Sequence, residues 1–189
     1  LNRGFTRIKS SLESLKSQDK MTDAEADEIL SRIKGVKTLE EAAKDVELVS
    51  ESLAEDLKLK QQIFARLDEL CPEDVILSSN TSGLSPTAIA KNTTHPQRVV
   101  IGHFWNTPKL VPRVEVVPGE KTSKETMDKN SEFVDMIGKK SVGMEKECPG
   151  FIGNRLQLAL LREALYIVEQ GWAKPEEVDK AVEYGHGRR

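Results

Sequence analysis

The chain has 189 residues, of which 38% are hydrophobic and 31% are charged, and its formal net charge is −3 at pH 7. This composition is ordinary for a globular protein, and the charge gives no reason to expect nucleic acid or an anionic membrane as a partner. No apolar run approaches the ~20 residues that a membrane span needs, and no signal-peptide pattern opens the chain. We therefore expect a cytoplasmic protein of one or two domains.

The chain contains two cysteines, Cys71 and Cys148. Neither lies in a CxxC motif or beside clustered histidines, so the sequence predicts no metal site. Two such cysteines are typical of reduced, packed thiols in a reducing compartment.

Residues 1–34 are predicted to form a helical hairpin. In the first half, apolar residues recur at spacings of three and four, as on one face of a helix: Leu1, Phe5, Ile8, Leu12 and Leu15. Thr22 and Glu25 form a capping-box pattern at the start of the second helix, and we expect Gly35 to end that helix.

Residues 46–144 alternate short apolar segments with amphipathic ones. The apolar segments predict strands at residues 46–49, 75–78, 99–104, 114–117 and 141–144. Helical periodicity and capping residues predict helices at residues 39–43, 56–70, 86–91 and 123–137. Strands that alternate with helices in this way favour a parallel or mixed α/β sheet.

The character of the sequence changes after Pro149. Residues 151–169 are predicted to form one long helix that is apolar on more than one face, so we expect it to be buried on more than one side. A second helix is expected from residue 174 onward. We place a domain boundary here, between a sheet domain at residues 1–148 and the start of an all-helical domain at residues 149–189.

Two residues in neighbouring predicted strands form a candidate catalytic pair. His103 follows an apolar run, and a histidine titrates near neutrality and can take a proton from a hydroxyl group. Glu115 lies within the next strand, and a carboxylate bonded to an imidazole fixes its tautomer. Spacing alone leaves open a structural histidine and a solvated glutamate.

Polar residues at other predicted boundaries are candidates for ligand binding. Asn80 and Ser82 follow a buried strand, where such groups bind a ligand or form a simple turn. Asn154 lies in the first turn of the long helix, where it can face a cleft or cap the helix. The charge pattern of Glu55 and Lys60 by itself favours a surface ion pair. The sequence contains no GxGxxG, P-loop or HExxH motif.

Four short motifs follow one another along the chain: S-N-T-S-G-L at 79–84, G-H-F-W-N at 102–106, V-E-V-V at 114–117 and P-G-F-I-G-N-R at 149–155. Their order and intervals resemble those of the NAD-dependent 3-hydroxyacyl-CoA dehydrogenase family. The resemblance implies an α/β fold. It consists of a Rossmann-type domain with an inserted helical hairpin, followed by a helical domain through which the family forms homodimers.

By this resemblance, the chain is an oxidoreductase of fatty acid metabolism and β-oxidation. It would pass hydride from the C3 hydroxyl carbon of a 3-hydroxyacyl-CoA to NAD. His103 would be the general base and Glu115 its partner. Ser82 and Asn154 would hydrogen-bond the substrate or its transition state. A base that works near neutrality suits this reaction, because the hydroxyl proton must leave as the hydride departs.

The resemblance also implies a cofactor site and a CoA contact. The positions that match NAD contacts in the family are Glu55, Lys60, Ser82 and Asn106. Ser11 lies where the family contacts CoA. The resemblance implies no metal ion.

The chain also departs from the family pattern. The family's first strand and glycine-rich loop precede the matched region, and most of its helical domain follows it, so we expect the chain to be part of a longer protein. Thr107 replaces a proline, and Gln18 falls where some members carry a lysine. Two alternatives to acyl-CoA oxidation therefore stay open. One is a dehydrogenase of a free β-hydroxy acid, of the gulonate or carnitine type, and the other is a truncated non-catalytic module.

Overall fold

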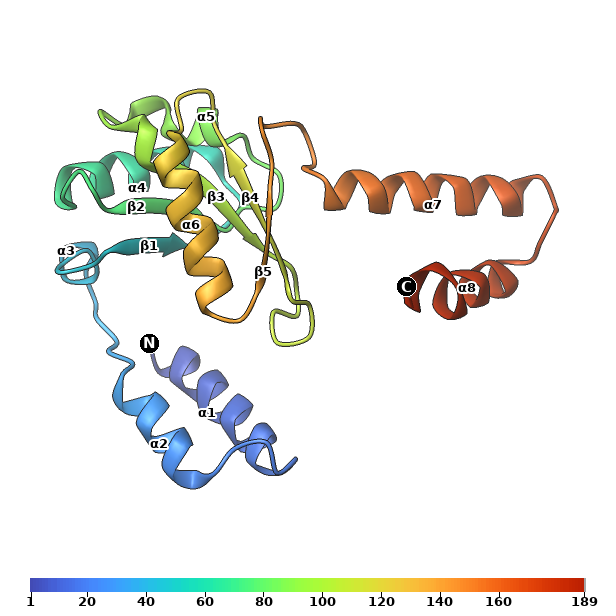
Figure 1. Ribbon diagram of the computed structural model, residues 1–189, viewed down its shortest axis with the longest axis horizontal. Coiled ribbons are helices and arrows are strands. Elements are labelled where there is room, and N and C mark those ends of the chain that lie inside the picture. The colour runs from blue at the N-terminus through green and yellow to red at the C-terminus, as the bar shows by residue number, and fades with distance from the viewer. Residues whose placement is uncertain (189) are drawn as a thin grey trace. The chain divides into compact units, whose positions relative to one another are not determined.

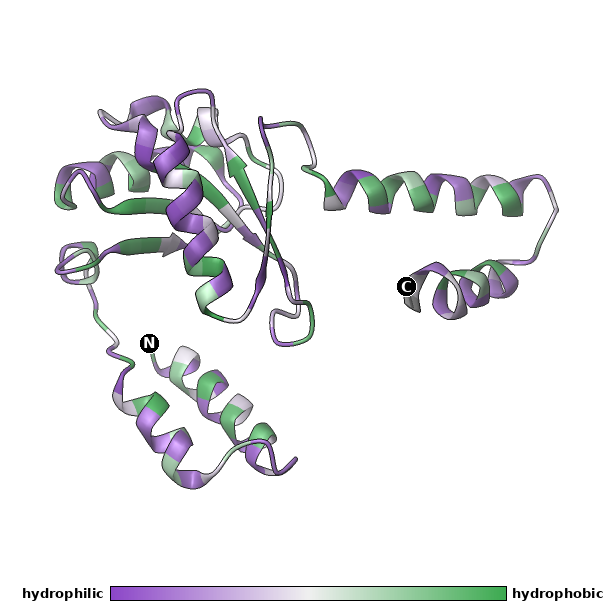
Figure 2. Cartoon of the chain, in the orientation of Figure 1, coloured by the Kyte–Doolittle hydropathy of each residue, from purple (hydrophilic) through white to green (hydrophobic). Residues whose placement is uncertain are grey.

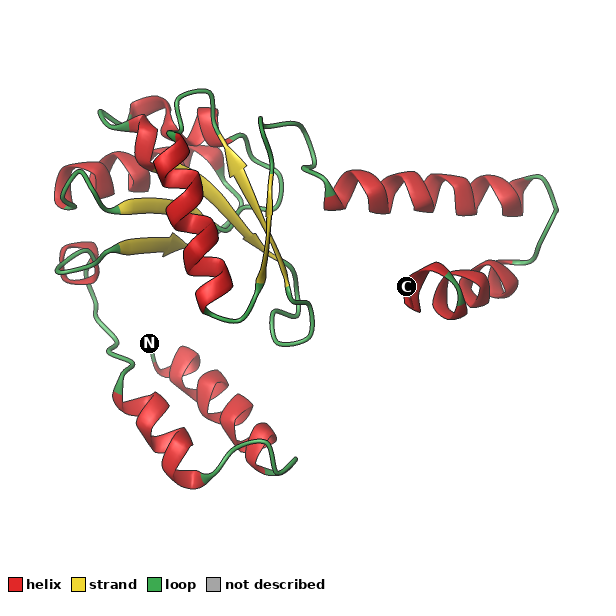
Figure 3. Ribbon diagram, in the orientation of Figure 1, coloured by secondary structure: helices red, strands yellow, loops and turns green. Residues whose placement is uncertain are grey.

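The computed structural model describes residues 1–188. The chain divides into two compact units, Leu1–Val46 and Glu47–Arg189. The first unit is helical, and the second contains all the strands of the described chain (Figure 3).

The first unit consists of the helices α1 (Asn2–Lys16), α2 (Asp23–Ser31) and α3 (Leu39–Ala42). The predicted helical hairpin is confirmed in α1 and α2, which run in opposite directions (Figure 1). The capping box forms as the sequence indicates. The Glu25 amide donates to the Thr22 hydroxyl, and the Thr22 amide donates to the Glu25 carboxylate.

Gly35 does not end α2, which stops at Ser31, so that prediction is wrong. Gly35 instead lies against the ring of Phe5, where an added Cβ would come within 2.8 Å of a ring carbon. The glycine allows the chain to approach α1 closely, which is a packing role rather than a capping role.

The second unit is built on a five-stranded sheet with the order β1-β2-β3-β4-β5. The strands are β1 (Leu48–Glu51), β2 (Ile76–Ser79), β3 (Val99–Phe104), β4 (Arg113–Pro118) and β5 (Lys140–Gly143). All neighbouring strands pair in parallel except β3 and β4, which are antiparallel. The predicted α/β sheet is therefore confirmed, in its mixed form.

Helices cover both faces of this sheet (Figure 1). On one face α6 (Lys124–Met136) packs over a cluster of buried side chains: Ile76, Val100, Val114, Val116 and Val134. The helices α4 (Leu57–Leu70) and α5 (Pro86–Ile89) pack on the other face. Side chains alternate between the faces along a strand, so His103 points away from α6, whereas Val100 faces it.

The predicted elements of this unit lie within two residues of the observed ones. The strand expected at residues 46–49 is observed two residues later as β1, because Leu48 to Glu51 are the residues that pair with Ile76 to Ser79 of β2. The segment expected as one helix at residues 86–91 divides into α5 and a 3₁₀ turn at Ala90–Asn92. Further 3₁₀ turns occur at Pro96–Arg98 and His186–Arg188.

A buried ion pair anchors the start of β3. Arg98 donates to the Asp68 carboxylate of α4 at 2.7 Å and to the carbonyl groups of Cys71 and Val75. Burial alone would raise the pKa of the Asp68 carboxyl, but Arg98 and two backbone amides outweigh it and lower that pKa. The pair fixes the end of α4 against the strand whose other end carries His103.

Two helices follow the sheet, α7 (Gly153–Glu169) and α8 (Pro175–Tyr184). The expectation that α7 is buried on several sides is wrong, since Gly153 is its one buried residue. Apolar bands run along α7 in Figure 2, and the exposed side chains include Leu156, Leu158, Leu160, Leu161 and Leu165. Among the described residues, the short helix α8 is the main helix packed on α7, and it cannot cover several faces. No helix of the described chain is long and apolar enough to span a membrane.

Candidate active site

Polar side chains gather at one edge of the sheet. Because β1, β2 and β3 are parallel, their carboxyl ends meet at this edge, and the antiparallel β4 begins there. Glu51 ends β1, Ser79 ends β2, and His103 lies next to the last residue of β3. Open α/β sheets bind their ligands outside the carboxyl ends of the strands, so this edge is where a site is expected.

His103 and Glu115 face each other across β3 and β4. They are partners in the antiparallel register, so their side chains emerge side by side on the same face. His103 Nδ1 lies 2.8 Å from Glu115 Oε2, and the two residues are 5% and 0% exposed. The expected contact is present, and the alternative of a solvated glutamate is wrong.

Four hydrogen-bond donors surround the Glu115 carboxylate. Oε2 accepts from His103 and, at 3.2 Å, from the indole Nε1 of Trp105. Oε1 accepts from the backbone amides of Ile152 and Gly153 at 3.1 and 2.7 Å. Burial alone would raise the pKa of this carboxyl, but the hydrogen bonds outweigh it and hold the pKa below its ordinary value. Glu115 is therefore ionised and can only accept.

The ionised Glu115 fixes the tautomer of His103. Because a carboxylate cannot donate, Nδ1 of the imidazole carries the proton of their hydrogen bond. The lone pair of the neutral ring then lies on Nε2, which has no hydrogen-bond partner among the described residues. Nε2 is thus the atom that can take a proton from a ligand.

A tight turn brings the start of α7 to Glu115. Gly150 and Phe151 have φ angles of 78° and 50°, a left-handed conformation that glycine adopts readily and phenylalanine rarely. The Phe151 ring is buried against His103 in an edge-on contact, with ring centroids 5.7 Å apart. The turn therefore closes one side of the imidazole and directs two backbone amides toward Glu115.

Ser82 and Asn154 lie together, whereas Asn80 has a bridging role. Asn154 Nδ2 donates to the backbone carbonyl of Ser82 at 2.8 Å. In the described chain the Ser82 hydroxyl and Asn154 Oδ1 have no hydrogen-bond partner, so both are open to a ligand. Asn80 uses its amide to link strand ends. It accepts from the Phe104 amide at 2.8 Å and donates to the Ser52 hydroxyl at 3.3 Å.

Lys60 lies in a buried ion pair. Its Nζ donates to both oxygens of Glu51, at 2.7 and 2.9 Å, and the two side chains are 1% and 3% exposed. The Ser79 hydroxyl donates to the same carboxylate at 2.6 Å. The expected ion pair of Glu55 and Lys60 is present, since Lys60 Nζ also lies 3.7 Å from Glu55 Oε2. Its interpretation as a surface pair is wrong for Lys60, because the buried carboxylate of Glu51 holds its ammonium inside the fold.

Glu55 stays accessible, with 47% of its side chain exposed. It accepts from the Thr81 hydroxyl and, at 3.0 Å, from the Ser82 amide, which ties the turn after β1 to the turn after β2. Asn106 is exposed in the loop after β3. Ser11 is exposed on α1, in the first unit.

The groups at this edge fit a nicotinamide dinucleotide. Its carboxamide and ribose hydroxyls need amide, hydroxyl and carboxylate partners, and Asn106, Ser82 and Glu55 present one of each to solvent. Lys60 does not, since its ammonium is held by Glu51. Residues 1–188 hold no group of three or more His, Cys, Asp or Glu side chains placed to bind a metal ion.

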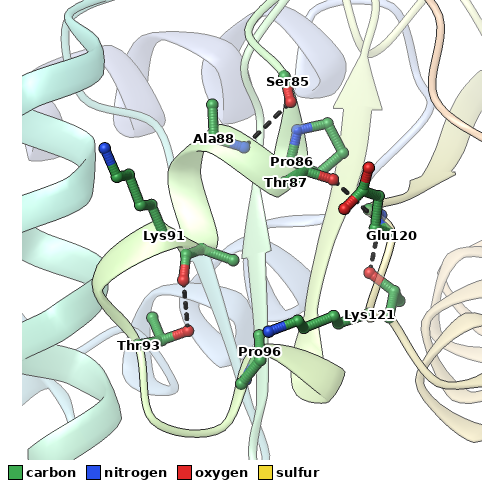
Figure 4. A pocket seen from close by; sticks show the side chains of 12 residues that line it. Ser85, Pro86, Thr87, Ala88, Lys91, Thr93, Pro96, Glu120 and Lys121 are labelled. Carbon is green, nitrogen blue, oxygen red and sulfur yellow. Dashed lines mark hydrogen bonds between the residues drawn. The ribbon is translucent and has the colours of Figure 1, made fainter.

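Two of the cavities in the second unit lie beside the sheet. One, of about 410 Å³, is lined by α5 and the loop after β4, with Thr87, Lys91 and Lys121 among its residues (Figure 4). It opens beyond the carboxyl end of β4, whereas the candidate site lies where β4 begins. The two are therefore at opposite ends of the strands. The other, of about 310 Å³, is lined in part by Phe151. Of these two cavities, the second adjoins the candidate site, because Phe151 packs against His103.

Comparison with known proteins identifies the family. Residues 1–148 match the sequence family described as 3-hydroxyacyl-CoA dehydrogenase, NAD binding domain, and residues 150–189 match the C-terminal domain of the same family. The chain belongs to the 3-hydroxyacyl-CoA dehydrogenase family.

Relatives within the family carry two kinds of name. The chain is 43% identical over 160 residues to an L-carnitine dehydrogenase of Nocardiopsis dassonvillei, covering 85% of this chain and 49% of that protein. It is 39% identical over 185 residues to a 3-hydroxybutyryl-CoA dehydrogenase of Clostridioides difficile, covering 98% and 65%. The crystal structure of (S)-3-hydroxybutyryl-CoA dehydrogenase from Ralstonia eutropha matches with a TM-score of 0.90 at 32% identity, covering 98% and 65%. The chain spans about half the length of the L-carnitine dehydrogenases it matches.

The sequence pattern assigns no role to Glu51 or Trp105, although both are central to this candidate site. One signal for Glu51 was available. It is a carboxylate at the end of a buried strand, and Lys60 follows it by nine residues in the next helix. Trp105 gave no such signal, because its contact with Glu115 depends on the pairing of β3 with β4.

We predict that Lys60→Met lowers the free energy of unfolding by about 3–5 kcal/mol, because it leaves the buried Glu51 carboxylate without its cation. Lys58→Met on the same helix is the control, since Lys58 is exposed. Urea denaturation followed by circular dichroism measures both variants. Equal unfolding midpoints for the two variants would contradict the structural role of Lys60.

A second prediction concerns acid stability. The pKa of Glu115 is below its ordinary value of 4.5 in the folded chain, so the unfolded chain takes up the proton first as the pH falls. The stabilisation from Glu115 is therefore complete above about pH 4.5 and is lost as the pH falls through the lower folded value.

Urea midpoints measured from pH 7 to pH 3 test this dependence. Glu115→Gln should be less stable by about 2 kcal/mol at pH 7, because one carboxylate oxygen becomes an NH2 group that cannot accept from the buried donors, and it should lose less stability on acidification. Glu125→Gln, at an exposed ion pair on α6, should keep the acid dependence of the parent chain. An unchanged acid dependence in Glu115→Gln would contradict the assignment.

Proposed function

We propose that this chain is the catalytic part of an NAD-dependent dehydrogenase that oxidises the C3 hydroxyl group of a 3-hydroxyacyl-CoA, a reaction of fatty acid β-oxidation. The observation that carries the proposal is the His103–Glu115 pair, with Nδ1 bonded to the carboxylate and Nε2 left open. This arrangement suits a general base whose proton acceptor faces a ligand. Membership of the family supports the same chemistry.

In this proposal, His103 Nε2 accepts the proton of the substrate hydroxyl. NAD, when bound, supplies the acceptor for the hydride that leaves C3. Glu115 holds the imidazole in the required tautomer and becomes the counter-ion of the imidazolium that forms. Phe151 packs against the ring and keeps water from one side of it.

Ser82 and Asn154 are the proposed partners of the substrate oxygen. Their open hydroxyl and carbonyl groups lie beside each other, joined by the Asn154–Ser82 hydrogen bond. Glu55, Ser82 and Asn106 are the proposed NAD contacts, since they are accessible at the carboxyl edge. Lys60 is proposed to act there indirectly, by holding Glu51 and so the end of β1.

The second candidate substrate is a free β-hydroxy acid of the carnitine type. The 43% identity to an L-carnitine dehydrogenase favours it, whereas the 3-hydroxybutyryl-CoA dehydrogenase match covers 98% of the chain and favours the thioester. The exposed Ser11 of α1 is the proposed CoA contact. We also propose the division into an NAD-binding domain at residues 1–148 and a helical domain beginning at residue 149.

The experiment that tests the function uses the full-length protein. His103→Gln should lower turnover by about 10³-fold or more, because the general base is lost, and NAD binding measured by calorimetry should persist. Retained turnover would exclude His103 as the base. Turnover of 3-hydroxybutyryl-CoA, L-carnitine and 3-hydroxybutyrate by the unchanged protein then assigns the substrate. A kcat/KM higher for either free acid than for the thioester would overturn the acyl-CoA proposal.

A homodimer through the helical region is also proposed. Its support is the row of exposed apolar side chains on α7, because apolar patches of this kind mark protein interfaces. Leu165→Asp should convert the dimer into a monomer in sedimentation velocity, whereas Gln62→Asp on α4, also at an exposed position, should not. A monomeric parent protein at micromolar concentration would exclude the dimer.

A further inference from the structure

Trp105 contacts the candidate catalytic pair without touching Nε2. Its indole Nε1 donates to Glu115 Oε2 at 3.2 Å, the same oxygen that accepts from His103 Nδ1 at 2.8 Å. The rings of Trp105 and His103 are tilted toward each other, with centroids 6.2 Å apart. Two donors therefore share one carboxylate oxygen.

The Trp105 ring is held in this position from two directions. The guanidinium carbon of Arg113 lies 4.1 Å from the ring centroid, a distance at which a cation is attracted to an aromatic face. Gly153 lies against the ring, and a Cβ at this position would overlap it. Arg113 and Glu115 alternate with Val114 along β4, so both emerge on the face that carries the pair.

We propose that Trp105 is a positioning residue of the dehydrogenase, which sets the basicity of His103 by sharing the Glu115 oxygen with it. The proposal rests on the proposed function, in which His103 is the general base. The indole N–H withdraws part of the charge of Oε2 from the His103 hydrogen bond. The carboxylate then stabilises the protonated imidazole less strongly than it would without the indole N–H.

Charged and titratable side chains lie on two elements that pack around His103, namely β4 and the connection to α7. On β4 these are Glu115 and Arg113, and the guanidinium of Arg113 stays in place in the variants below. On the connection to α7, the Glu147 carboxylate accepts from the Ser85 hydroxyl at 2.6 Å, Cys148 Sγ lies 3.7 Å from the Phe151 carbonyl, and Arg155 donates to the Pro149 carbonyl. The neighbouring strand β2 contributes no titratable side chain. The loss of the N–H group at Trp105 Nε1 therefore acts on His103 through Glu115.

The test is Trp105→Phe in the full-length protein, because phenylalanine keeps an aromatic ring beneath Arg113 but has no N–H group. We expect the midpoint of the His103 titration, followed by the NMR signal of its ring Cε1 proton, to rise by about 0.5 unit, a fraction of the roughly one to two units that a whole hydrogen bond to a charged acceptor is worth. The lower limb of the pH profile of kcat/KM should move by the same amount. Trp172→Phe is the matched control, since Trp172 is exposed after α7 and packs on Tyr166, and it should leave both unchanged.

A second variant covers the case in which Trp105→Phe fails to fold. In a Trp172→Phe background, benzothienylalanine at position 105 replaces the indole N–H by sulfur with nearly the same shape, and it should give the same upward shift. An unchanged titration midpoint in a folded variant overturns the proposal and leaves Trp105 with a packing role. The NMR titration does not depend on turnover, so it also separates this outcome from a failure of His103 as the base.

Discussion

The carboxylate of Glu115 is the group on which the candidate site depends. A buried carboxylate is costly unless each oxygen is hydrogen-bonded, and here its donors come from three separate segments. His103 belongs to β3, Trp105 to the loop after it, and the two backbone amides to the start of α7. Each of these segments must therefore reach the same point. The turn before α7 does so with two residues, Gly150 and Phe151, in the left-handed conformation.

The antiparallel pairing of β3 with β4 makes this arrangement possible. If β4 ran parallel to β3, with their carboxyl ends together, the early residues of β4 such as Glu115 would lie away from the carboxyl end of β3. Because β4 instead starts at the carboxyl edge, Glu115 pairs directly with His103 near the end of β3. The departure from parallel order thus brings a second strand's side chains to the edge where ligands bind.

Much of the fold and half of the candidate site could be predicted from local pattern. Alternating apolar segments located the five strands within two residues, and the placement of His103 and Glu115 in neighbouring strands suggested their contact. The pairing of Lys60 with Glu51 could not be predicted as reliably, because it depends on how α4 packs over the end of β1. The long helix α7 was misjudged for a related reason. Its apolar pattern predicts that partners exist, but it does not say whether they belong to this chain.

Three carboxylates that are buried in the described chain differ in what neutralises them. Glu51 is paired with the Lys60 ammonium and Asp68 with the Arg98 guanidinium. Glu115 has no lysine or arginine within ion-pair distance among the described residues, and its donors are amides, an indole and an imidazole. A proton that arrives on His103 therefore gives Glu115 its first full counter-charge. The two carboxylates that are paired with cations stabilise the sheet, whereas the charge of Glu115 is left to stabilise an imidazolium, as the proposed role of His103 as a general base requires.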